Sequence, residues 1–220
     1  MRTPAALLAT VLSVSVIAAG CTTAQSEATS EPVAKATQVP TIALGDAAVP
    51  YEPAAMAPPI DLVRPDGTAY EVSDALGSPL LVFFGYTNCP DVCPATFGTL
   101  INVLKERPDA EVAFITVDPE RDTPEWMAGW MDYLPDSFTG LTGTPAQIRT
   151  AADAYGARYA RGEDTDWGYL MVHSADVYLI DDAGRLLARY PFGTKADAIV
   201  ADIALAVPQQ NIPTAGVTAG

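Results

Sequence analysis

The feature that most constrains the fold is an apolar run that ends in a loop with two cysteines. Residues 80–84 are all apolar, so a strand here has no polar face for water and belongs at the centre of a sheet. Residues 85–94 follow directly and contain Cys89 and Cys93. After the loop, apolar residues recur with the spacing of an amphipathic helix, at Phe97, Leu100, Ile101 and Leu104.

The rest of the central region alternates between strand and helix patterns. A Pro-Asp-Gly turn predicts a hairpin over residues 60–77. Further strands are expected at 111–117, 138–141, 176–180 and 185–190, and helices after Thr123-Pro124, at 144–156 and at 194–207. The polar segment 161–169 is expected to be a loop. This order predicts a three-layer α/β domain, and a strand, two-cysteine loop and helix are typical of the thioredoxin-like sandwich, here with an added N-terminal β-hairpin.

The N-terminus has the pattern of a targeting segment. Arg2 supplies a positive charge, residues 7–19 are apolar, and small residues precede Cys21. This resembles a bacterial lipoprotein signal peptide over 1–20, with Cys21 as the lipidated residue. The alternative is an ordinary signal peptide with an incidental cysteine. Either way, we expect the domain to work outside the cytoplasm, and the lipid would hold it on the extracytoplasmic side of the cell membrane.

The remaining boundaries follow from composition. Residues 21–57 are rich in Ala, Thr, Ser, Glu and Pro and are expected to form a flexible tether. The folded domain is expected over 58–207, and 208–220 is expected to be a disordered tail. The net charge of −15 repels phosphate backbones, so no nucleic-acid partner is expected.

The two cysteines of the loop can do sulfur or metal chemistry. Cys93 is expected at a helix N-terminus, where the helix dipole lowers thiol pKa. Structural zinc usually takes four ligands, commonly from two such pairs, and only one pair exists once Cys21 is set aside. Copper(I) is soft and accepts two thiolates and one imidazole. The chain has a single histidine, His173, placed just before a predicted strand.

Several alternatives remain open at this point. Cys89 and Cys93 can instead form a structural or redox-active disulfide, and His173 can be an ordinary core or loop residue. The charged residues of 118–122 are interpreted as a salt-bridged turn. The acidic residues Glu163, Asp164 and Asp166 are interpreted as part of a solvated loop. Met171, Trp126 and Trp130 are expected in the core rather than as a ligand or a docking platform.

Four segments together resemble the Sco/SenC family, over about residues 58–207. They are residues 86–94, 117–125, 141–144 and 173–181. The resemblance implies a thioredoxin-like copper chaperone with Cys89, Cys93 and His173 as copper ligands. It also implies a role in assembling the dinuclear copper centre of cytochrome c oxidase subunit II, or delivery to another exported copper protein. Many members carry an aspartate immediately before the histidine, where this chain has Val172.

A second function is compatible with the same residues. A thiol–disulfide oxidoreductase that reduces the cysteines of the copper-receiving protein would use Cys89 and Cys93 as its catalytic pair. Such an enzyme needs neither copper nor His173. The sequence leaves open whether the loop binds a metal ion, takes part in thiol–disulfide exchange, or does both.

Overall fold

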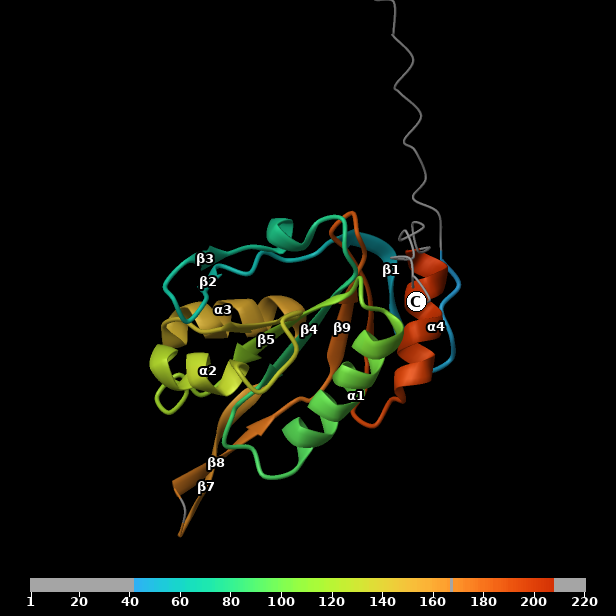
Figure 1. The fold of residues 1–220 in the computed structure, drawn as a ribbon. Helices are drawn as coiled ribbons and strands as arrows, with labels where there is room; N and C mark the ends of the chain where they lie inside the picture. The colour runs from blue at the N-terminus through green and yellow to red at the C-terminus, as the bar shows by residue number, and fades with distance from the viewer. Residues whose placement is uncertain (1–41, 167, 208–220) are drawn as a thin grey trace, which may run out of the picture. The chain divides into compact units, whose positions relative to one another are not determined.

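The computed structural model describes residues 42–166 and 168–207. Its main sheet has six strands in the order β1-β10-β9-β4-β5-β6. Their bounds are β1 Val49–Met56, β4 Leu80–Gly85, β5 Glu111–Thr116, β6 Phe138–Leu141, β9 Val177–Ile180 and β10 Arg185–Tyr190. β4, β5 and β6 run parallel, whereas β9, β10 and β1 complete the other half in antiparallel pairs (Figure 1). The predicted α/β class is confirmed.

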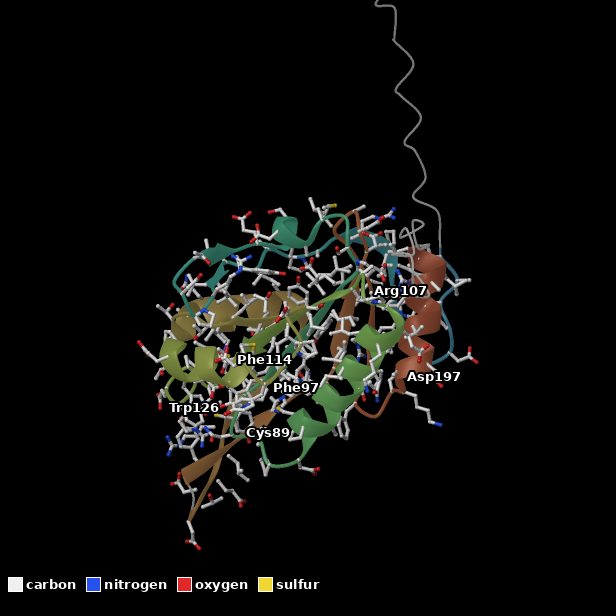
Figure 2. The ribbon with its side chains drawn as sticks, in the orientation of Figure 1. Cys89, Phe97, Arg107, Phe114, Trp126 and Asp197 are labelled. Atoms are coloured by element: carbon white, nitrogen blue, oxygen red, sulfur yellow. The ribbon has the colours of Figure 1, made fainter. Side chains whose placement is uncertain are left out.

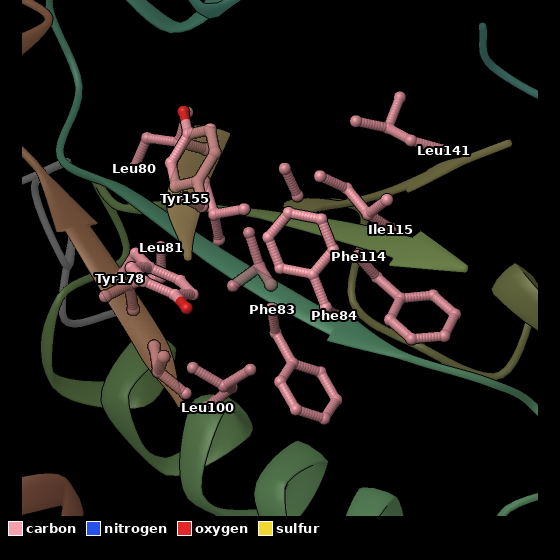
Figure 3. Close-up of a cluster of buried hydrophobic side chains, with 14 of the residues drawn as sticks. Leu80, Leu81, Phe83, Phe84, Leu100, Phe114, Ile115, Leu141, Tyr155 and Tyr178 are labelled. Carbon is pink, nitrogen blue, oxygen red and sulfur yellow. The ribbon is translucent and has the colours of Figure 1, made fainter. Parts of the chain in front are cut away.

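Helices cover both faces of the central strand β4. The helices are α1 Val92–Glu106, α2 Pro124–Met131, α3 Pro145–Tyr155 and α4 Ala196–Ala206. Phe83 of β4 meets Phe97 of α1 at a ring-centroid distance of 5.6 Å, and the next residue, Phe84, meets Tyr155 of α3 at 5.8 Å. Successive strand residues point to opposite faces, so these contacts place α1 and α3 on opposite sides of the sheet (Figures 1 and 3). The apolar run therefore forms the buried central strand that the sequence predicted.

Two short hairpins stand outside the main sheet. The predicted N-terminal hairpin is present as β2 Leu62–Val63 and β3 Ala69–Tyr70, followed by a 3-10 turn over Val72–Ala75. A bridge between Val63 and Thr142 attaches this hairpin beside β6. The second hairpin consists of β7 Tyr159–Thr165 and β8 Gly168–His173, where a loop was predicted.

The loop prediction failed because only one of the two strands alternates regularly between half-buried and exposed side chains. In β8, residues 169, 171 and 173 are half-buried and their neighbours are exposed, whereas β7 is mostly exposed and polar. Hydrogen bonding between the two strands, rather than a buried face, defines β7. β7 is therefore a strand because it pairs with β8, and the polar composition of residues 161–169 does not indicate this pairing.

The folded part also begins before the predicted boundary at residue 58. β1 lies inside the expected tether and pairs with β10 at the edge of the sheet. Its pattern shows no regular alternation, and Pro50 and Pro53 interrupt it, which an edge strand tolerates. Farther upstream, the backbone N–H of Gly45 donates to the buried Asp202 carboxylate at 2.6 Å.

The remaining predictions concern helix ends and the termini. Thr123 and Thr144 cap α2 and α3 through their side chains, as predicted, and Gly156 ends α3 with a φ of 72°. The predicted signal peptide, Cys21 and the tail 208–220 lie outside the described residues. No helix in the described part of the chain is both long and apolar enough to span a membrane.

Candidate metal centre

The two-thiol loop joins the central strand β4 to helix α1. β4 ends at Gly85, and α1 begins at Val92, so Cys93 lies in its first turn. A Cβ atom at Gly85 would lie 2.9 Å from the Cys93 Sγ and 2.9 Å from Cε1 of Phe83. Glycine at the end of β4 is therefore what leaves room for the Cys93 thiol above the strand.

Replacing Gly85 by alanine is expected to destabilise the domain and to displace the Cys93 thiol. The added methyl group must move ring and sulfur atoms in a packed core, which costs about 1–3 kcal/mol. Urea unfolding measures this loss. Gly98→Ala is the matched control, because nothing lies within 4 Å of a Cβ there, and the change should stabilise α1 by about 0.5–1 kcal/mol. Equal stability of Gly85→Ala and wild type would contradict the steric role of Gly85.

Both loop thiols are buried and free. Cys93 is 1% exposed and Cys89 is 9% exposed. The backbone N–H of Cys93 points at the Cys89 Sγ, with an N–S distance of 3.4 Å. The four-residue spacing thus brings the two sulfurs to one side of the turn, as the sequence indicated.

His173 is the last residue of β8 and reaches the thiols across 80 residues of sequence. Its Nε2 lies 3.5 Å from the Cys93 Sγ. Its Nδ1 lies 2.9 Å from the carbonyl oxygen of Ser174, and because a carbonyl only accepts, Nδ1 carries the hydrogen. The lone pair of Nε2 then faces the sulfurs. The ring of Tyr86 packs edge-on against the imidazole at 5.7 Å.

Together the three side chains form a compact donor set. One ligand atom each from Cys89, Cys93 and His173 lie within 4.8 Å of one another, and no carboxylate of the described residues joins them. Thiolate and imidazole donors suit soft or borderline metals such as copper(I) and zinc. Three donors fall short of a closed structural zinc site but suffice for copper(I). The structure thus brings together all three residues that the sequence proposed.

Burial shifts the pKa values of Cys93 and His173. Burial raises the pKa of the Cys93 thiol, and the nearby Cys89 adds to the effect. The predicted lowering by the helix dipole is therefore wrong, because desolvation of the thiolate outweighs it. Burial lowers the pKa of His173, so its imidazole is neutral at pH 7 and available as a ligand.

A buried carboxylate anchors the loop that carries Cys89. Asp122 is 0% exposed and accepts hydrogen bonds from the backbone N–H of Thr87 at 3.0 Å and from the hydroxyl of Thr116 at 2.6 Å. The Thr87 hydroxyl also donates to it. The sequence placed Asp122 in a turn before α2 but gave no sign of this link to a loop 35 residues away.

Arg121 ties the histidine hairpin to the same turn. Its Nη1 donates to the carbonyl of Tyr169 in β8 at 2.7 Å, and its guanidinium carbon lies 3.8 Å from the centre of the Tyr169 ring. Its Nε donates to Asp118, which also accepts from the Tyr169 hydroxyl at 2.7 Å. The predicted salt-bridged turn is confirmed by the Arg121–Asp118 pair, and its reach into β8 is an additional finding.

Removing Arg121 is expected to loosen the hairpin that carries His173. Arg121→Ala loses both the hydrogen bond and the stacking, so the β7–β8 amides should exchange with deuterium about tenfold faster. Mass spectrometry of exchange measures this. Arg64→Ala is the control, since Arg64 makes a similar contact with Tyr70 at 4.9 Å in another hairpin. Unchanged protection of β7 and β8 in Arg121→Ala would rule out the clamp.

The other residues considered from sequence lie around the centre without joining it. Met171 is half-buried on β8 and packs against the core, as expected. Trp130 packs against Phe97 at 4.8 Å, as expected for a core residue, but Trp126 is 52% exposed, contrary to expectation. The acidic residues 163, 164 and 166 are exposed at the end of the β7–β8 hairpin, in line with a solvated segment.

Comparison with known protein families gives one extended match. A family model described as SCO1/SenC matches residues 49–207. The matched region therefore includes the thiol loop, the Asp118–Asp122 turn and the histidine hairpin. It also includes β1, which agrees with the earlier start of the folded domain.

Curated relatives are similar over a large part of the chain. A SCO2-like protein of Rickettsia felis is 34% identical over 136 residues, which are 59% of this chain and 66% of that protein. The mitochondrial SCO1 homolog of Homo sapiens is 36% identical over 153 residues, 66% of this chain and 51% of that protein. The SenC protein of Rhodobacter capsulatus is 39% identical over 127 residues, 56% of this chain and 58% of that protein. The alignments thus span about half to two thirds of these relatives.

Solved structures share the fold. A structure described as Arabidopsis thaliana ScoI with copper bound matches with a TM-score of 0.66 and 28% identity, over 71% of this chain and 100% of that chain. Bradyrhizobium japonicum ScoI with copper bound matches with a TM-score of 0.61 and 32% identity, over 70% of this chain and 100% of that chain. The predicted thioredoxin-like frame is confirmed by these neighbours, whose architecture it shares.

Proposed function

This chain belongs to the SCO1/SenC family, and from that premise we propose that it is a copper chaperone. It binds one copper ion through Cys89, Cys93 and His173. The observation that carries this proposal is the convergence of the three ligand atoms within 4.8 Å, at the end of a strand–loop–helix unit. Two structures similar to it, from Arabidopsis thaliana and Bradyrhizobium japonicum, are described as copper-bound.

The donor set suits an ion that must later be released. Two thiolates and one imidazole satisfy copper(I), which accepts two or three ligands. A thiolate from the receiving protein can then replace one donor at a time, so the ion never needs to enter solution as a free cation. His173 is neutral and is therefore the easier donor to exchange, while the two thiolates hold the charge of the ion.

The proposed receiver is the dinuclear copper centre of cytochrome c oxidase subunit II, or another exported copper protein. The family resemblance supports this receiver. The proposed place of action is the extracytoplasmic side of the cell membrane, with a lipid on Cys21 as the anchor. The charged, apolar and small-residue pattern of residues 1–20 supports export and lipidation.

Metal analysis of the purified, reduced protein tests the central proposal. Wild type is expected to retain one copper per chain after desalting, measured by mass spectrometry of the metal content. The double variant Cys89→Ser, Cys93→Ser should retain none, because hydroxyl groups are poor ligands for soft copper. Stoichiometric copper in the double variant, or its absence from wild type, would refute the site.

The second candidate function is thiol–disulfide exchange at Cys89 and Cys93. The proximity of the two free thiols favours it, because a disulfide between them needs little rearrangement. Single Cys→Ser variants should then trap a mixed disulfide with the cysteines of the copper-receiving protein. A Cys89–Cys93 reduction potential well above that of the partner disulfide would exclude the reductase role.

A further inference from the structure

One face of α2 presents aromatic side chains to solvent beside the metal centre. Trp126, Gly129 and Trp130 follow the spacing i, i+3 and i+4 on α2, and Tyr133, two residues past the end of the helix, lines the same hollow, so the four residues form one stripe. Trp126 is 52% exposed and Tyr133 is 86% exposed. Contiguous exposed apolar surface with a polar rim is a mark of protein–protein interaction sites. We call this stripe, with the adjoining Glu125, the α2 groove.

The α2 groove is a preformed hollow. These residues line an open hollow of about 260 Å³. Gly129 lines this hollow, and a Cβ there would meet nothing within 4 Å. One wall is fixed because Trp130 packs against Phe97 at 4.8 Å and Phe114 at 5.6 Å. The other wall is fixed because the indole N–H of Trp126 donates to the Thr87 hydroxyl at 2.8 Å.

The charge around the α2 groove selects its occupant. Glu125 lines the hollow, and Asp132 and Asp136 are exposed on the following segment. The sequence from residue 122 to residue 148 contains no lysine, arginine or histidine. Aromatic faces attract cations, and exposed carboxylates add to this attraction. The groove therefore fits a guanidinium or ammonium group better than a neutral apolar side chain.

The position of the α2 groove connects it to copper exchange. The Trp126 side chain donates a hydrogen bond to Thr87, which lies two residues before Cys89 in the thiol loop. Figure 2 shows Cys89 and Trp126 at the same end of the domain. We propose that the α2 groove receives an arginine or lysine side chain of the protein that exchanges copper with the centre at Cys89, Cys93 and His173. This inference rests on the proposed chaperone function.

The first test asks whether the α2 groove prefers a cation. Acetyl-arginine amide is titrated into the full protein, and the indole N–H signals of Trp126 and Trp130 are followed by NMR. Saturable shifts are expected, about tenfold weaker with acetyl-citrulline amide, which has the same shape without the charge. Gly129→Leu fills the hollow and should abolish the shifts. Equal shifts with both amides, or no shift at all, would overturn the cation site.

The second test asks whether occupancy of the groove serves copper transfer. Copper-loaded protein is mixed with the copper domain of cytochrome c oxidase subunit II, and the transfer rate is measured. Gly129→Leu should slow transfer about tenfold with unchanged copper affinity, a loss of the size of one hydrogen-bonded or stacked contact. Ala128→Leu is the matched control, since it adds the same side chain to an exposed position of α2 outside the groove.

The outcomes separate the two proposals. Equal transfer by Gly129→Leu and wild type would overturn the role of the groove and leave the chaperone function standing. Failure of wild type itself to transfer copper would overturn the proposed receiver, and with it the occupant named here. A wild-type dimer that Gly129→Leu converts to a monomer in sedimentation would identify a second copy as the occupant and would also overturn the proposal.

Discussion

Replacing His173 by alanine is expected to weaken copper binding by at least about 100-fold. Even the loss of a hydrogen-bond partner of a metal ligand typically costs about 10–100-fold in affinity, so loss of a ligand should cost at least the upper value. The effect should be larger for copper(II), which prefers nitrogen donors more strongly than copper(I) does. Competition against a chelator of known affinity, in each oxidation state, measures both constants.

The control for this experiment lies one residue away. Val172 is 66% exposed and points away from the centre, so Val172→Ala should bind copper as wild type does. Thermal unfolding of both variants without metal shows whether the fold is intact. A His173→Ala protein that holds copper(I) and copper(II) as tightly as wild type would show that the site has only two protein ligands.

Replacing Asp122 by alanine is expected to cost about 3 kcal/mol of unfolding free energy. Hydrogen bonds to a charged group contribute about 1.5–3 kcal/mol each, and the donors of Thr87 and Thr116 would be left without an acceptor. The loop before Cys89 should loosen at the same time, so alkylation of Cys89 should become faster. Urea unfolding and the rate of thiol alkylation measure the two effects separately.

Asparagine at position 122 separates the roles of shape and charge. With its amide oxygen in the place of Oδ2, Asp122→Asn still accepts from the Thr87 backbone N–H and from the Thr116 hydroxyl. The Thr87 hydroxyl can rotate to accept from the amide nitrogen in the place of Oδ1. Its loss of stability should therefore be less than half that of Asp122→Ala. A stability of Asp122→Ala within 0.5 kcal/mol of wild type would show that the loop is held by other contacts.

The sequence predicted the parts of the fold that have strong local signals. The apolar run at 80–84 identified β4, and the Thr-Pro pairs identified the starts of α2 and α3. The strands β1, β7 and β8 were missed. β1 and β7 are largely exposed, and neither shows regular alternation. β1 pairs with β10, more than 120 residues along the chain, and β7 pairs with β8, the next strand in the sequence.

The sequence predicted the candidate ligands of the site. It did not predict the contacts that hold the segments carrying those ligands in place. The rarity of cysteine and histidine in the chain drew attention to Cys89, Cys93 and His173, and the structure places them together. The contacts of Asp122 with Thr87 and of Arg121 with Tyr169 join segments 35 and 48 residues apart. No periodicity or spacing encodes such contacts. The direction of the Cys93 pKa shift likewise depends on burial, which only the folded chain reveals.

The hairpin that ends in His173 has a thermodynamic consequence. β7 and β8 form a two-stranded sheet with no ladder to the six-stranded sheet, whereas both cysteines belong to the unit built on β4 and α1. A copper ion held by all three residues would therefore cross-link two parts of the domain that belong to separate sheets and are otherwise joined through side-chain contacts such as those of Arg121. Part of the binding free energy would be used to order the ribbon of β7 and β8. A contact that bends this ribbon would then lower copper affinity without touching either sulfur.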